Sequence, residues 1–150
     1  MLTTVIAVIG TLLGAVAAGV IQHRTARTTR SEARDDHRRD RELEAVTALA
    51  SGLAGHRRAM SVRGGLRLSG ASPEAVAAAR AESHATRSAI EAPRIQVAIL
   101  VPSLAAAAEE ATRAAFALRG APDQQSLNAL REEAVTAADR FVAAAARYFA

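Results

Sequence analysis

The sequence contains no cysteine, no lysine and no tryptophan, and it has only four aromatic residues. Without cysteine it has no disulfide framework, no thiolate nucleophile and no cysteine-based zinc site. All 19 basic residues are arginine. The sequence therefore lacks the lysine that reaches the phosphate in a phosphate-binding loop. Residue types that favour strands are sparse, whereas 39 of the 150 residues are alanine, the strongest helix former. We therefore expect an all-α protein, and the composition disfavours a β-sandwich or barrel.

An uncharged run opens the chain. Residues 1–21 carry no ionisable side chain, and His23 and Arg24 are the first such groups after them. About 20 apolar residues suffice to span a bilayer as a helix. We therefore predict a retained transmembrane helix at 1–21. Because arginine-rich flanks stay inside, this predicts a single-pass protein of the cell membrane with its N-terminus outside and residues 22–150 in the cytoplasm.

Two alternatives to this span stay open. The first is a cleaved signal peptide, for which Ala15-Val16-Ala17 resembles a small-residue cleavage site. It is disfavoured because no positive charge precedes the run and because the run is longer than a usual signal core. The second alternative is a buried helix of a soluble protein.

Small residues recur every four positions within the run, at Gly10, Gly14 and Ala18. Such spacing lets two helices approach closely in lipid, where packing drives association. We expect this face to form a homo-oligomer. The motif is weak by itself, since glycine and alanine are frequent throughout this segment.

An arginine-rich segment follows at 22–69, with eleven arginines and six acidic residues, a formal +5, whereas residues 73–150 hold eight and nine, a formal −1. We expect Arg24, Arg27 and Arg30 to contact anionic lipid headgroups, because they directly follow the span. Direct contact with nucleic acid is disfavoured, since the sequence shows neither a helix-turn-helix nor an aromatic-bearing basic surface. The segment is expected to continue the membrane helix and to supply the first bundle helix.

The remaining chain is predicted to form a cytosolic antiparallel helical bundle, with further helices at about 73–92, 102–119 and 125–149. Ser72-Pro73-Glu74 is a strong helix start, with a capping serine and a proline at the first helical position. Pro93 is expected to end that helix. The alternating apolar residues at 95–101 then form a helical or extended connector.

Apolar residues spaced by three or four mark the buried face of each predicted helix. The final helix carries an unbroken coiled-coil-like alternation. The predicted positions are Leu43, Val46, Leu49, Ala50 and Leu53; Val76, Ala79, Ser83, Thr86 and Ile90; Leu104, Ala107, Ala111, Ala115 and Leu118; and Leu127, Leu130, Ala134, Ala137, Phe141, Ala144 and Tyr148. Because alanine buries little area, such a core is expected to gain from oligomerisation or a partner.

Catalytic chemistry finds little support, and we expect neither an enzyme, nor a cofactor, nor a metal. The histidines lack metal-ligand spacing, although His56 and His84 could meet across the first hairpin. The pairs Glu109-Glu110 and Glu132-Glu133 point about 100° apart on a helix and are most simply solvated. Arg57-Arg58 is the densest basic cluster away from the membrane, and it either contacts an acidic partner or faces solvent.

Several segments together resemble small actinomycete membrane proteins of the KilB-like family. They are the apolar VIAVIGTLLGAVAAGV, Gln22-His23 with the arginines after it, His56–Met60, Ser83–Ile90 and the alanine-rich final helix. The resemblance covers most of the chain and implies an accessory role in plasmid spread and DNA transfer between mycelial compartments, with a possible partner in the transfer machinery. It carries over no catalytic residues.

Two hypotheses from different classes follow. The first is a non-enzymatic, oligomerising membrane protein that presents its bundle to a transfer machine. The second is a structural subunit of a filament or phage-type assembly, in which the apolar helix packs among its own copies. A phage holin is a weaker third hypothesis, because a large cytosolic part is unnecessary for making holes.

Overall fold

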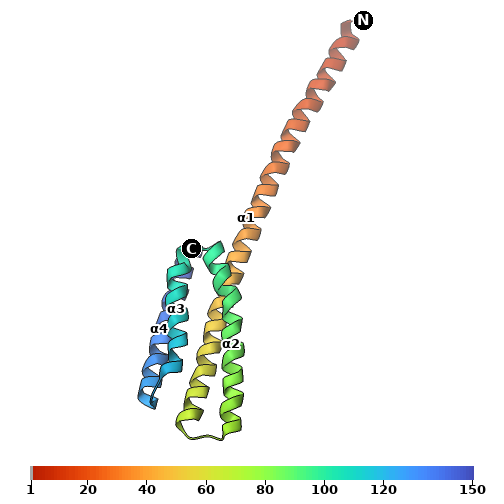
Figure 1. The fold of residues 1–150 in the computed structure, drawn as a ribbon. Helices are drawn as coiled ribbons and strands as arrows, with labels where there is room; N and C mark the ends of the chain where they lie inside the picture. Colours follow the sequence, from red (N-terminus) through yellow and green to blue (C-terminus); the bar gives the residue numbers. More distant parts are fainter. Residues whose placement is uncertain (1) are drawn as a thin grey trace. The chain divides into compact units, whose positions relative to one another are not determined.

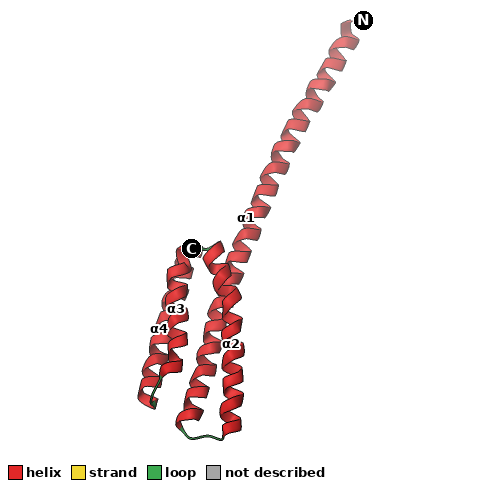
Figure 2. Cartoon of the chain, viewed as in Figure 1, coloured by secondary structure: helices red, strands yellow, loops and turns green. Residues whose placement is uncertain are grey.

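The structure is a computed structural model that describes the backbone of residues 2–150 and the side chains of residues 33–150. All regular elements in the described backbone are helices (Figure 2), which confirms the all-α prediction. The chain divides into two compact units, Met1–Asp40 and Arg41–Ala150. The elements are α1 (Leu2–Leu68), α2 (Pro73–Leu100), the 3-10 turn η1 (Pro102–Leu104), α3 (Ala105–Ala117), the 3-10 turn η2 (Leu118–Gly120) and α4 (Gln124–Phe149).

The predictions made for the N-terminal segment fall on side chains outside the described range. They concern the span at 1–21, the packing residues Gly10, Gly14 and Ala18, and the lipid contacts Arg24, Arg27 and Arg30. These remain predictions. Across the residues whose side chains are described, no single helix is long and apolar enough to cross a membrane. The helices Pro73–Leu100 and Pro102–Gly120 meet that test only as a pair, across a bend of 119°.

The second unit is a bundle of four antiparallel helices, as predicted. Figure 1 shows the C-terminal part of α1, then α2, α3 and α4 running in alternating directions. The loop between α1 and α2 and the loop between α3 and α4 lie at one end of this bundle. The bend at Val101 and the C-terminus lie at the other. Gly70 has a φ of 68°, a left-handed conformation that lets the chain reverse tightly after α1.

Side-chain caps fix the starts of α2 and α4. The hydroxyl of Ser72 accepts a hydrogen bond from the backbone N–H of Ala75, so the predicted helix start is confirmed. The carboxylate of Asp123 accepts the N–H of Ser126 at 2.7 Å. These hydrogen bonds favour the ionised carboxylate and lower the pKa of Asp123. Both helices therefore begin where local capping chemistry places them.

The predicted effect of Pro93 was wrong. A helix at 73–92 followed by a separate connector at 95–101 was expected, whereas α2 continues through Pro93 to Leu100. A proline inside a helix costs about 3 kcal/mol, because it lacks an N–H and crowds the preceding turn.

Burial on both sides of Pro93 explains why α2 continues. Ile90 and Val97, seven residues apart, lie on the same helix face, and both are completely buried. Fully burying an aliphatic side chain contributes about 1.5–3 kcal/mol. The burial of Val97 offsets much of the local cost of the proline, since ending the helix at residue 92 would forfeit it.

The core of the bundle is rich in alanine, as predicted. Of the 21 buried apolar residues that the structure describes, ten are alanine, and Phe141 is the largest side chain that is completely buried. A close helix approach occurs at Gly64, where an added Cβ would lie 2.8 Å from Cδ2 of Leu127 on α4. The alanines and this glycine therefore bring the helix backbones close together.

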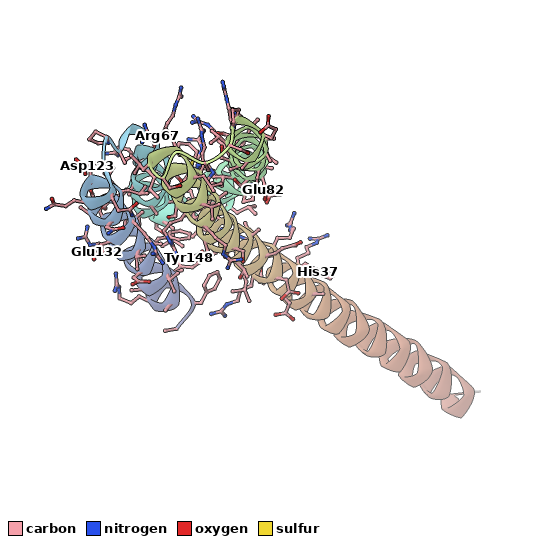
Figure 3. All side chains as sticks on the ribbon, turned by 90° about the horizontal axis from the view of Figure 1, so that it is seen from below. His37, Arg67, Glu82, Asp123, Glu132 and Tyr148 are labelled. Atoms are coloured by element: carbon pink, nitrogen blue, oxygen red, sulfur yellow. The ribbon has the colours of Figure 1, made fainter. Side chains whose placement is uncertain are left out.

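Two predicted core positions are solvent-exposed, namely Leu43 (52% exposed) and Tyr148 (40% exposed). Their neighbour Glu42 is buried instead. The Tyr148 hydroxyl donates a hydrogen bond of 3.0 Å to the Glu42 carboxylate, which joins the end of α4 to α1 (Figure 3). A buried carboxylate needs such partners. The rest of the predicted α1 face is confirmed, because Val46, Leu49 and Leu53 are buried.

Candidate functional site: an arginine-lined cavity

Arg57 and Arg58, the predicted partner-contact residues, lie on the α1 surface that faces α4. They line an open depression together with Arg131 of α4. Arg57 is half-buried and Arg58 is exposed. The depression is a surface hollow, and contact with an acidic partner remains a prediction.

His56 and His84 do meet across the first hairpin, because both line one small cavity of about 50 Å³. We call this site the arginine-lined cavity, since four of the residues around it are arginines. It is formed by three helical segments that run side by side: His56, Met60 and Arg63 from α1; Arg80, Ser83, His84 and Arg87 from α2; and Phe116 and Arg119 from α3 and η2.

His56 is deeply buried, with 2% of its surface exposed. Burial, together with the charge of Arg87, lowers the pKa of His56 to about 4. Its Nδ1 lies 3.0 Å from the hydroxyl oxygen of Thr86. The low pKa makes His56 a neutral imidazole that is hydrogen-bonded to Thr86.

Phe116 holds two of the cavity residues in place. Its ring meets the His56 imidazole edge to face, with a centroid distance of 5.2 Å. The guanidinium carbon of Arg87 lies 4.1 Å from the centre of the same ring. The ring thus attracts the Arg87 cation through its π face and positions this charge at the cavity.

Arg63 of α1 is held by a side chain of α2. Its guanidinium donates a hydrogen bond of 3.1 Å to the Ser83 hydroxyl, which in turn donates to the Arg80 carbonyl oxygen at 2.8 Å. Burial and the neighbouring charges of Arg80, Arg119 and Arg67 lower the pKa of Arg63. Like charges therefore accumulate around this guanidinium.

The charge of the arginine-lined cavity has no acidic counterpart. No acidic side chain lines it, and none of the ion pairs found among the described residues involves Arg63, Arg80, Arg87 or Arg119. A second depression, between α3 and α4, shows the opposite arrangement, because Arg140 there pairs with Glu110 at 2.6 Å. Four positive charges thus gather at the arginine-lined cavity without a carboxylate among the residues that line it.

Figure 3 views the bundle from the end that carries the two loops and places Arg67 and Asp123 there. Arg67 donates a hydrogen bond to the Ala121 carbonyl oxygen, which joins the end of α1 to the turn after η2. This contact fixes the cavity walls relative to each other.

Sequence reasoning found the two histidines and missed the four arginines. On α2, Arg80, His84 and Arg87 are spaced by four and three, which places them on one helix face. On α1, His56 and Arg63 are seven residues apart and also share a face. An antiparallel hairpin brings residues equally far from its loop together, so this spacing could have revealed one basic face opposite another.

The adjacent glutamates were expected to point apart, and Glu109 and Glu110 do so. Glu109 pairs with Arg94 at 3.3 Å and Glu110 with Arg140, so the two neighbours point to different helices. Glu132 and Glu133 are exposed. Within residues 33–150 no group of three or more His, Cys, Asp or Glu side chains could hold a metal ion. What the arginine-lined cavity can do chemically is attract an anion.

Comparison with known proteins found one family that matches nearly the whole bundle. The family described as KilB plasmid transfer protein matches residues 43–149. Protein KilB of Streptomyces lividans is 61% identical over 149 residues, which cover 99% of each of the two chains. No solved structure matches the chain. The range matched by the family includes every residue of the arginine-lined cavity.

Proposed function

The chain belongs to the KilB plasmid transfer protein family, and from this premise we propose that it is a membrane-anchored, oligomerising accessory factor in plasmid spread. It performs no catalysis itself. It presents its helical bundle on the cytoplasmic side to the transfer machinery, whereas its N-terminal helix lies in the cell membrane.

The observation that carries this proposal is the position of the uncharged run. Residues 1–21 are long enough to span a bilayer, and Arg24, Arg27 and Arg30 follow directly. A separate compact unit, Arg41–Ala150, comes after them. The arrangement favours an anchor followed by a folded cytoplasmic part.

The non-enzymatic role is supported by the chemistry of the described residues. A general base works best with a pKa near the operating pH, whereas the buried His56 has a pKa of about 4 and bonds Thr86. The carboxylates of Glu109 and Glu110 form ion pairs with arginines of two different helices, α2 and α4. These groups are engaged in structure.

Oligomerisation is supported by the small residues Gly10, Gly14 and Ala18, which follow each other at intervals of four. Leucines at these positions would keep the segment apolar and would fill the contact face. We expect the variant Gly10→Leu/Gly14→Leu/Ala18→Leu to remain in the membrane, to yield fewer cross-linked oligomers and to support roughly tenfold less plasmid spread between colonies. The spread figure follows from a loss of about 1.4 kcal/mol in association free energy.

The matched control is Val8→Leu/Val16→Leu, which changes positions about 200° around an ideal helix from Gly10 and Gly14. This variant should spread the plasmid and cross-link as the unaltered chain does. Equal cross-linking in both variants would exclude this face as the oligomer contact. Normal plasmid spread by a chain lacking residues 2–21 would contradict the anchored role itself.

A further inference from the structure

We propose that the arginine-lined cavity binds a doubly charged terminal phosphate group carried by a small soluble anion. This inference goes beyond the proposed function, because it depends neither on the membrane anchor nor on a role in plasmid spread. It rests on the convergence of Arg63, Arg80, Arg87 and Arg119 from three helical segments around one small cavity.

The first step is the unbalanced charge. Four guanidinium groups gather where no carboxylate lines the cavity. Arg94 of the same bundle, by contrast, is paired with Glu91 and Glu109. Like charges held together destabilise a folded protein, so a site of this kind gains stability when an anion neutralises it.

The second step is the choice of anion. Guanidinium groups form paired hydrogen bonds with the oxygens of phosphate, and they do so in a fixed planar geometry. Several of them converging on one point favour a compact anion with charge close to −2, which a terminal phosphate carries. A DNA duplex presents its single charges in a row along its backbone, and this arrangement would call for an extended basic surface.

The third step is the construction of the site. Arg63 is held by Ser83, and Arg87 is held over the Phe116 ring. Two of the four cations are therefore positioned before any ligand arrives, which lowers the entropic cost of binding. The cavity volume of about 50 Å³ exceeds the roughly 10–15 Å³ that is needed to hold a single water. The cavity thus has room for a small polar group.

The experiment measures thermal unfolding of the full-length protein in detergent by circular dichroism at about pH 8, where inorganic phosphate is mostly a dianion. The probe is inorganic phosphate, compared with sodium chloride at equal ionic strength. We expect phosphate to raise the melting temperature by several degrees in a saturable manner, as binding to the folded state alone requires. Stabilisation by phosphate no greater than that by chloride would overturn the proposal.

The key variant is Arg80→Gln, because Arg80 is exposed and its nearest neighbours on α2 are not acidic. In chloride this variant should melt roughly 1–3 °C higher than the unaltered chain, because a like-charge repulsion is removed. Its apparent affinity for phosphate should fall roughly tenfold or more, the effect of losing one charged hydrogen bond. A merely structural arginine would show the opposite sign in chloride.

The matched control is Arg113→Gln, which removes the same charge from α3 beside Glu110 and Glu133. It should keep the full response to phosphate. An equal loss of response in both variants would show nonspecific screening and would overturn the proposal.

A second probe, dimethyl phosphate, carries a single charge and imitates the phosphodiester of a lipid headgroup or a nucleic acid. We expect it to stabilise the protein far less than inorganic phosphate. Equal stabilisation would assign the cavity to a phosphodiester and would contradict a terminal phosphate as its ligand.

Discussion

Phe141→Ala is expected to lower the free energy of unfolding by about 3–5 kcal/mol, the range found for removing a buried phenylalanine. Phe141 is completely buried and is the largest of the fully buried side chains. The buried positions one turn away on α4 are Ala137 and Ala145. Because alanine has no rotamers with which to fill a cavity, the space left by the ring would stay largely empty.

Val142→Ala is the matched control, since Val142 is the next residue on α4 and is half exposed. Its substitution should change stability by no more than about 0.5 kcal/mol. Denaturant unfolding of the full-length chain, followed by helical circular dichroism, measures both variants. A loss below about 1.5 kcal/mol for Phe141→Ala would mean that the bundle repacks, and would contradict the tight core described above.

Acidification is expected to destabilise the bundle through His56, by about 3 kcal/mol in total. The pKa of His56 is about 4 in the folded chain, against 6.5 for an unperturbed histidine. Between these values the unfolded state binds more protons than the folded state, so stability falls as the pH falls. Each pKa unit corresponds to about 1.4 kcal/mol. The contribution is fully present above pH 6.5 and is lost as the pH approaches 4.

His56→Gln removes this titration, so its stability should depend less on pH in that window than the stability of the unaltered chain. The carboxylates titrate in both proteins, and their contribution cancels when the two curves are subtracted. His84→Gln is the control, because His84 lines the same cavity and is exposed. Denaturant unfolding at a series of pH values measures the slopes. Parallel curves for His56→Gln and the unaltered chain would contradict a buried, neutral His56.

Local chemistry explains which parts of the fold were predictable. The start of α2 at Ser72-Pro73 was predicted correctly because capping depends on adjacent residues alone. The effect of Pro93 was not, because the burial of Val97 that offsets its cost depends on neighbouring helices. A local rule and a tertiary contact compete there, and the tertiary contact decides where the helix ends.

The exposure of Leu43 on α1 shows the same limit. Leu43 and Glu42 are adjacent and so differ by about 100° around the helix. Hydrophobicity favours burying the leucine, whereas the structure buries Glu42 and bonds it to Tyr148 of α4. The partner lies 106 residues away in the sequence, and no local pattern indicates it.

The candidate site was predictable only in part. The meeting of His56 and His84 followed from the length of the first hairpin. Arg63, Arg80 and Arg119 come together only because η2 lies beside α1 and α2. In the sequence these arginines look like ordinary exposed charges, and only the folded structure shows that they line one cavity.

Fractionation with protease protection of the full-length protein, tagged at its C-terminus, tests the central claim most directly. If residues 1–21 span the membrane with the bundle inside, the tag should pellet with membranes and resist an alkaline wash. Protease added outside intact protoplasts should leave the tag untouched and should digest it after lysis. A tag that stays in the supernatant, or one that protease removes from intact protoplasts, would contradict the anchored, inward-facing arrangement.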